Sequence, residues 1–321
     1  MTPYTAAYRG SLSADALSMP VHWYYDREAL LREYGVVDHF IAPKNPHTGT
    51  FMDRTHYAAL NEKGDILREQ AEYYGMAGIH YHQFLQAGEN TLNFQLAIEL
   101  YDFVKERGGY DADAWLERYI ARMLEPGWHR DTFVEEYHRN FFTNYAKGKP
   151  PRECGVSDKH IGGLAQVPAL VAALEGTSLE ELRAIVKEHV GLTHPHPEAL
   201  RAADALVRLL VAVAGGKSIR EAIGAEAGDW LAAEDIEAWI AAGEEDNHVV
   251  GQRFSAACYV EDAMPSSLFL AWKYADDFKA GLVANTMAGG DNCHRGAVVG
   301  GLLGASSGVP EELRVKEIIN H

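Results

Sequence analysis

Apolar residues recur at the spacing of an α-helix wherever this sequence shows a regular pattern. Between residues 91 and 104, Leu92, Leu96 and Leu100 follow the 3.6-residue period of a helix, and Gly108 ends the segment. Similar patterns predict helices at residues 113–124, 167–174, 179–189, 197–214, 219–225 and 233–242. Alternating runs of β-branched residues bounded by turn dipeptides are almost absent, so we expect an all-α fold.

Two stretches lack this periodicity. Residues 35–64 contain several prolines and glycines, and residues 126–163 contain Gly148-Lys149-Pro150-Pro151. We expect both to be irregular, and long irregular loops inside compact domains often carry function. No internal repeat and no linker rich in Gly, Ser or Pro divides the sequence, so residues 1–321 are expected to form a single domain.

The sequence carries a large negative charge. Its 321 residues include 46 acidic and 29 basic side chains, which gives a formal charge of −17, and no run of Lys and Arg offsets this charge locally. Nucleic acid and anionic membranes are therefore poor partners. Three scattered cysteines, the lack of a signal-peptide pattern and the lack of a membrane-spanning apolar stretch lead us to expect a cytoplasmic protein.

Three segments place polar residues at the ends of expected helices. Asp291-Asn292-Cys293-His294 follows two glycines and opens a helix rich in small apolar residues, and Glu89-Asn90-Thr91 also follows a glycine. Pro20 should terminate an earlier apolar helix and leave His22 just beyond its end. Helix starts offer free amide groups and a positive dipole end, so we expect these polar groups to converge on one site.

These segments resemble motifs of the ADP-ribosylglycohydrolase family, which includes the dinitrogenase-reductase-activating glycohydrolase and the J1-crystallins. Ala14-Asp15-Ala16-Leu17-Ser18-Met19-Pro20-Val21-His22 looks like the family motif G-D-A-L-G-x-P-x-E, with His22 at the acidic position. Gly88-Glu89-Asn90-Thr91 looks like T-D-D-T, and Gly289-Gly290-Asp291-Asn292-Cys293-His294 looks like G-G-D-T-D-T. The resemblance spans nearly the whole chain and implies one compact all-α domain of orthogonally packed helices.

The resemblance also implies a pair of Mg²⁺ ions, held by carboxylates and threonines, that serve to bind and hydrolyse N- or O-glycosidic bonds to ADP-ribose. This sequence has His, Asn and Cys at several of those positions, and Mg²⁺ needs hard oxygen ligands. The cofactor is therefore left open between one divalent transition metal, such as Zn²⁺ or Fe²⁺, and no metal. The candidate metal ligands are Glu89, Asp291 and His294.

Several of the same residues are candidates for catalysis and substrate binding. Cys293, at a helix start beside an imidazole, is a candidate nucleophile, with His22 or Glu89 as acid or base. The candidates for substrate binding are Trp23, Asn90 and Asn292. Each has a structural alternative, because lone cysteines are usually buried, Asn and Glu cap helices, and neighbouring aromatic residues usually pack in the core.

The sequence thus predicts a hydrolase that cleaves an N-glycosidic bond, ADP-ribosyl or nucleoside-like, or a related C–N bond, in a small-molecule or ADP-ribosylated substrate. The alternative is a catalytically inactive ADP-ribose-binding or structural homologue. The replaced motif positions hold reactive or ligating residue types, which favours an enzyme. His80 and His82 add two imidazoles shortly before Glu89, and they are interpreted either as members of the site or as ordinary surface or core histidines.

Overall fold

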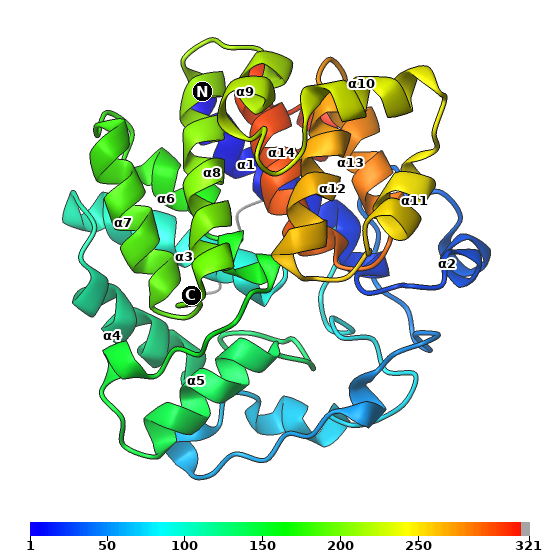
Figure 1. Ribbon diagram of the computed structural model, residues 1–321. Helices are drawn as coiled ribbons and strands as arrows, with labels where there is room; N and C mark the ends of the chain where they lie inside the picture. Colours follow the sequence, from blue (N-terminus) through cyan, green and yellow to red (C-terminus); the bar gives the residue numbers. More distant parts are fainter. Residues whose placement is uncertain (316–321) are drawn as a thin grey trace.

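The regular structure of this protein is helical. The computed structural model describes residues 1–315, and in that range it contains no strand, only an isolated bridge between His160 and Tyr259. The all-α fold expected from the sequence is confirmed (Figure 1). The α-helices are α1 (Pro3–Ser18), α2 (Arg27–Tyr34), α3 (Leu92–Arg107), α4 (Ala112–Met123), α5 (Glu136–Ala146), α6 (Val167–Ala173), α7 (Leu179–Gly191), α8 (Pro197–Ala214), α9 (Ile219–Glu226), α10 (Ala233–Ala241), α11 (Asp246–His248), α12 (Val260–Lys273), α13 (Phe278–Met287) and α14 (Asn292–Ser307).

Helices α1 and α14 form the centre of this arrangement and approach each other through glycine. A β-carbon added at Gly300 would lie 2.3 Å from the carbonyl oxygen of Gly10, and one added at Gly296 would lie 2.9 Å from the β-carbon of Ala14. Gly300 of α14 lies against Gly10 of α1, and Gly296, one turn earlier in α14, lies against Ala14, one turn later in α1. The two helices are therefore antiparallel. The C-terminal end of α1 therefore lies beside the N-terminal end of α14.

Other helices pack around this central pair. α14 also contacts α8, α12 and α13, and α1 also contacts α6. Figure 1 shows α8 and α12 in front of the pair. One large cluster of buried apolar side chains draws on most of these helices, which supports the expected single domain over residues 1–321, although that boundary stays a prediction. None of the helices described up to residue 315 is long and apolar enough to cross a membrane.

The sequence located some helices and missed others. All helices expected between residues 91 and 242 are confirmed, with ends that differ by three residues or fewer. The expectation that residues 126–163 are irregular is wrong in its middle, where α5 buries Tyr137, Phe141 and Phe142 on one face. α2, α12 and α13 were also not expected. α12 contains Pro265, a residue type that usually ends or kinks a helix, and this weakened the helical pattern.

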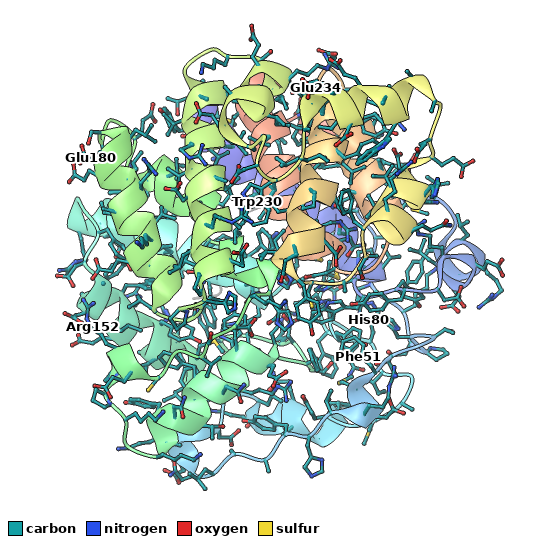
Figure 2. All side chains as sticks on the ribbon, in the orientation of Figure 1. Phe51, His80, Arg152, Glu180, Trp230 and Glu234 are labelled. Carbon is teal, nitrogen blue, oxygen red and sulfur yellow. The ribbon has the colours of Figure 1, made fainter. Side chains whose placement is uncertain are left out.

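Residues 35–91, between α2 and α3, contain no α-helix. Three short 3₁₀ turns occur there, so the irregularity expected for residues 35–64 is confirmed. The segment is anchored by Met52 and Tyr81, which pack with Trp23 and Phe133 in a small buried cluster. Figure 2 labels Phe51 and His80 in this part of the molecule, and the rings of both lie near the ring of Tyr81.

The glycine contact between α1 and α14 leads to a test of stability. We expect Gly300→Ala to lower the free energy of unfolding by about 1–3 kcal/mol, because the new β-carbon would meet backbone atoms that cannot move aside. Urea denaturation measures this change. Gly224→Ala in α9 is the matched control, since a β-carbon there meets nothing within 4 Å, and it should stabilise the helix by up to about 1 kcal/mol. Equal stability of Gly300→Ala and the native protein would contradict the close contact.

Candidate functional site

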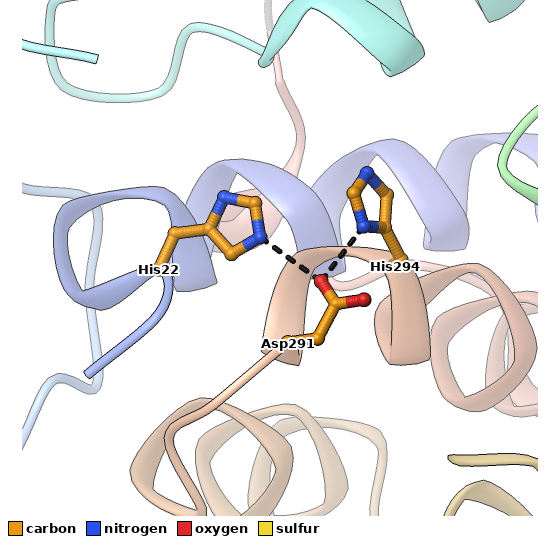
Figure 3. A group of neighbouring side chains, drawn as sticks. All are labelled: His22, Asp291 and His294. Atoms are coloured by element: carbon orange, nitrogen blue, oxygen red, sulfur yellow. Dashed lines mark hydrogen bonds and ion pairs between the residues drawn. The ribbon is translucent and has the colours of Figure 1, made fainter. Parts of the chain in front are cut away.

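Two histidines share one buried carboxylate where α1 and α14 meet. His22 follows the 3₁₀ turn Met19–Val21 that extends α1, and its Nε2 atom lies 3.0 Å from Oδ1 of Asp291. His294, in the first turn of α14, places its Nδ1 atom 2.7 Å from the same oxygen. Figure 3 shows both rings directed at Asp291. All three side chains are buried, and the second carboxylate oxygen, Oδ2 of Asp291, has no hydrogen-bond partner among residues 1–315.

A tight turn holds Asp291 against the segment that carries His22. Gly289 and Gly290 have φ angles of 66° and 60°, and a β-carbon at Gly290 would lie 2.1 Å from the carbonyl oxygen of Ala256. These positions therefore require glycine. The amide of Trp23 donates to the carbonyl of Gly290 at 2.8 Å. This backbone contact fixes the position of His22 relative to Asp291.

On one side, His22 continues into a second imidazole and a second carboxylate. Nδ1 of His22 lies 2.8 Å from Nε2 of His82, and Nδ1 of His82 lies 2.8 Å from Oδ1 of Asp131. The other oxygen of Asp131 accepts the backbone amide of Leu92, at the start of α3, at 2.7 Å. The indole of Trp23 stacks on the His22 ring with a centroid distance of 3.8 Å. The contact with His82 at the edge of the ring and the stacking of Trp23 on its face together fix the orientation of His22.

On the other side, His294 continues to Glu135. Nε2 of His294 lies 3.0 Å from Oε1 of Glu135, the residue that precedes α5, and Asn93 donates to the same oxygen at 3.1 Å. A continuous row of acids and imidazoles results. This acid–imidazole row consists, in order of contact, of Asp131, His82, His22, Asp291, His294 and Glu135.

Burial and neighbouring charges assign different protonation states to the two central rings. Burial lowers the pKa of His22 well below its usual value, although Asp291 acts in the opposite direction. Burial would also lower the pKa of His294, but the carboxylates of Asp291 and Glu135 outweigh it and raise that pKa well above its usual value. Burial would raise the pKa of Asp291, but His294 and His22 hold it far below its usual value. At neutral pH the row therefore contains an ionised Asp291 beside an imidazolium at His294.

A cavity of about 160 Å³ lies beside the acid–imidazole row. Ligand pockets for drug-sized molecules usually measure roughly 300–1,000 Å³, so this cavity suits one part of a substrate, such as a ring or a sugar. Side chains of three kinds line it. They are the aromatic residues Trp23, Tyr25, Phe51, Phe133 and Tyr137, the row members Glu135, Asp291 and His294, and a third group that includes Arg139, His160 and Cys258.

His160 and Cys258 come from segments that the isolated bridge holds together. The amide of Ile161 donates to the carbonyl of Cys258 at 2.7 Å, and Nδ1 of His160 lies 2.9 Å from Oδ1 of Asp158. Burial opposes protonation of His160, but its contacts with Asp158 and with the Cys258 thiol raise its pKa to about 11. His160 is therefore a cation at neutral pH, and it lies next to the partly exposed thiol of Cys258.

The structure brings together only some of the candidate residues named from the sequence. His22, Trp23, Asp291 and His294 meet at the site. Glu89 instead pairs with Arg130 at 2.6 Å. The three remaining candidates make structural contacts: Asn90 donates to Asp15 at 2.9 Å and to the carbonyl of Leu12, Asn292 donates to the carbonyls of Val21 and Thr286, and Cys293 packs with Met19 and Leu85. The functional roles assigned to these four residues stay predictions.

The surroundings of Cys293 differ from those of Cys258. Cys293 is fully buried, and its thiol lies 3.7 Å from the carbonyl oxygen of Asp15. Burial, followed by the nearby Asp15 and Asp291, raises the pKa of Cys293 well above its usual value. A buried thiol with a raised pKa is a poor nucleophile. Of these two cysteines, Cys258 is the one that lines the cavity.

Sequence reasoning missed the row members Asp131 and Glu135, the cavity residues His160 and Cys258, and Asp158, which contacts His160. His82 was named only as an imidazole of uncertain position. These residues lie outside the three motif segments, and the row and the bridge join them to the site through tertiary contacts. The acids and imidazoles form a row in the folded structure but not along the sequence.

The residues at this site do not fit a pair of Mg²⁺ ions. Both oxygens of Asp15 accept hydrogen bonds from Thr91 or Asn90, and Glu89 is held by Arg130. Asp291 is left as the carboxylate shared by His22 and His294, whose nearest donor atoms are imidazole nitrogens. Mg²⁺ prefers six oxygen ligands in octahedral geometry. This donor set is therefore too poor in oxygen for two such ions.

Comparisons with known proteins agree with the motif resemblance. The model of the ADP-ribosylglycohydrolase family matches residues 4–316. A solved structure described as "ADP-ribosylglycohydrolase-related protein complex" matches with a TM-score of 0.58 and 19% sequence identity, and the match covers 97% of this chain and 92% of that chain. At this identity, the structural similarity shows the fold alone. No curated protein matches the sequence.

The thiol beside His160 leads to a test of reactivity. We expect iodoacetamide at pH 7 to modify Cys258 before Cys154 and Cys293, which are buried in the folded protein. His160→Ala should slow modification of Cys258 by about tenfold, because the neighbouring cation is lost. Mass spectrometry of peptides from a time course measures both rates. His56→Ala, at an exposed histidine, is the control, and equal rates in the His160 and His56 variants would contradict activation by His160.

The buried histidines lead to a test of acid stability. Burial lowers the pKa of His189 to about 3 and that of His194 to about 4, and it lowers the pKa of His80 well below its usual value. The unfolded chain takes up these protons below about pH 6.5, whereas the folded protein does not, so stability falls by about 1.4 kcal/mol per pH unit for each such ring. His160 and His294, with raised pKa values, remain stabilising below pH 6.5 and only partly offset this loss.

We therefore expect the midpoint of thermal unfolding to fall as the pH is lowered from 7 to 5.5. His189→Gln should reduce the slope, because one ring that must stay neutral in the folded state is removed. A midpoint that rises over this range would show that the raised pKa values dominate.

Proposed function

We propose a function for this chain on the premise that it belongs to the ADP-ribosylglycohydrolase family, whose model spans residues 4–316. Membership supports a glycohydrolase-like function in general terms. We infer that the protein hydrolyses an N-glycosidic bond, in an ADP-ribosyl or nucleoside-like substrate, within the cavity beside the acid–imidazole row. The observation that carries this proposal is that two carboxylates, those of Asp291 and Glu135, line the same aromatic-walled cavity and are joined through one imidazolium, His294.

The cavity wall suits a substrate that has both a ring and an anionic group. Trp23, Phe133 and Tyr137 present aromatic surfaces against which a planar base or a sugar ring can pack. His160, whose pKa is raised to about 11 by Asp158 and Cys258 against the effect of burial, and Arg139 add positive charge. A phosphate or carboxylate of the substrate would pair with these two groups. An ADP-ribosyl or nucleotide-like substrate has this combination of features.

The two carboxylates suit the two charges that develop during hydrolysis of a glycosidic bond. Cleavage builds positive charge on the anomeric carbon, and the ionised carboxylate of Asp291 would stabilise it. Glu135 would accept a proton from the attacking water as its oxygen bonds to that carbon. The leaving nitrogen keeps the electron pair of the broken bond and takes the proton from Glu135. Water is thus divided between the two products, and Glu135 returns to its starting state.

The alternative function is binding of ADP-ribose without turnover. This alternative is favoured by three residues of the motif segments that make structural contacts. Glu89 forms an ion pair, Asn90 donates a hydrogen bond, and Cys293 packs against apolar side chains. The reactive groups that line the cavity favour hydrolysis instead.

We expect Glu135→Gln and Asp291→Asn each to lower kcat by about 100-fold or more, because each removes a carboxylate that acts on the reacting atoms while it keeps the side-chain shape. Release of ribose or ADP-ribose from a panel of N-ribosyl compounds, including ADP-ribosyl-arginine and nucleosides, measures this change. Glu106→Gln, at an exposed position of α3 that does not line the cavity, is the control.

The outcomes separate the two functions. Turnover that fails in both site variants and persists in Glu106→Gln supports the hydrolase. ADP-ribose binding at micromolar concentration with no turnover of any compound in the panel supports the binding protein and overturns the hydrolase.

A further inference from the structure

We propose that His22, Asp291 and His294 form a binding site for one divalent transition-metal ion, with Zn²⁺ or Fe²⁺ as the best match. The three side chains offer ligand atoms that all lie within 4.8 Å of one another, and all three are buried. Donor atoms that share one ion at metal–ligand distances of about 2.0–2.2 Å lie at most about 4.4 Å apart, so binding of an ion would draw these side chains slightly together. The use of such an ion in hydrolysis rests on the proposed function, whereas the binding of the ion does not.

An unpartnered oxygen points to a missing cation. Oδ2 of Asp291 is buried and has no hydrogen-bond partner in the described part of the protein. A buried carboxylate oxygen without a partner loses its hydration without compensation, and this is costly. Coordination of an ion by Asp291 would remove that cost. The two imidazoles already face the same carboxylate at 2.7 and 3.0 Å, and an ion that binds there would displace the proton that His294 carries in the metal-free protein.

The number of ring N–H groups in the row also leaves room for a cation. Asp131, His82, His22 and Asp291 are joined by three contacts of 3.0 Å or less. Two neutral imidazoles carry only two N–H groups. If His82 donates to Asp131 and His22 donates to His82, the Nε2 lone pair of His22 faces an oxygen of Asp291 with no hydrogen between them. A metal ion between these two acceptors would bind both.

The outer contacts of both rings match those of metal-binding histidines. Such histidines usually donate their second ring nitrogen to a carboxylate or another acceptor, which fixes the ring and makes it a better ligand. Nε2 of His294 contacts Glu135 at 3.0 Å, and Nδ1 of His22 contacts His82, which in turn contacts Asp131. The second nitrogen of His294 therefore meets a half-buried carboxylate directly, and that of His22 is connected to a buried carboxylate through His82. These carboxylates also balance the charge of a divalent ion.

The donor set selects the kind of ion. Two imidazole nitrogens and a carboxylate match zinc sites with three protein ligands and one open position, and they also match the 2-His-1-carboxylate sites of Fe²⁺. Asp291 and His294 line the cavity, so the open position can face the substrate. A bound ion there would lower the pKa of a coordinated water and help it to attack.

Binding can be measured without any substrate. We expect metal-stripped protein to take up one Zn²⁺ per chain in isothermal titration calorimetry, and Co²⁺ to give the visible absorption of a four- or five-coordinate site. Asp291→Asn and His294→Gln should each weaken binding by at least about 100-fold. His82→Ala should weaken it by about 10–100-fold, because it removes support from His22 without removing a ligand. His56→Ala, at an exposed histidine, should bind as the native protein does.

Two controls separate loss of metal binding from loss of folding. Circular dichroism identifies variants that fail to fold, and the Co²⁺ spectrum of the native protein tests the site without any variant. The proposal is overturned if the native protein takes up no stoichiometric ion, if it takes up two Mg²⁺ in preference, or if Asp291→Asn and His294→Gln bind Zn²⁺ as tightly as His56→Ala. Zn²⁺ binding without turnover would overturn the proposed function and leave the metal site standing.

Discussion

The close antiparallel contact between α1 and α14 is the constraint on which the rest of the structure depends. Glycine at positions 10, 296 and 300 lets the two backbones approach to a distance that any larger side chain would prevent. Because the helices are antiparallel, the end of α1 and the start of α14 lie at one place. His22 lies just beyond the end of α1 and Asp291 just before the start of α14, so this contact brings the two residues together.

The polar interactions at that place are costly to bury. Asp291 is ionised in the interior, and its charge is balanced by the imidazolium of His294, while the neutral ring of His22 lies on its other side. Buried ion pairs contribute little net stability, because the loss of hydration offsets the attraction between the charges. A continuous row of six such side chains therefore needs a reason other than stability. A cavity that touches Glu135, Asp291 and His294 provides one.

Much of the fold could be predicted from the sequence, because helices leave a periodic pattern of apolar residues. The structure brings His22, Asp291 and His294 of the motif segments together, and the functional roles given to them stay predictions. The rest of the site could not be predicted, since His82, Glu135 and His160 reach it through single tertiary contacts that leave no periodic trace. The sequence also cannot distinguish the buried Cys293 from Cys258, because exposure of a thiol depends on which segments pack around it. The sequence also could not show that Glu89 pairs with Arg130 and Asn90 with Asp15, because both contacts depend on how distant segments pack.

The segment of residues 35–91 has a consequence for the dynamics of the molecule. It contains no α-helix, so its backbone lacks the repeated hydrogen bonds that make a helix open as one cooperative unit. It nevertheless carries His82, one of the six members of the row, and Phe51, which lines the cavity. Local unfolding of this segment would detach one end of the row and uncover the cavity, while the α1–α14 pair stayed folded. A molecule in which this segment unfolded locally would keep the α1–α14 core but lose the assembled site.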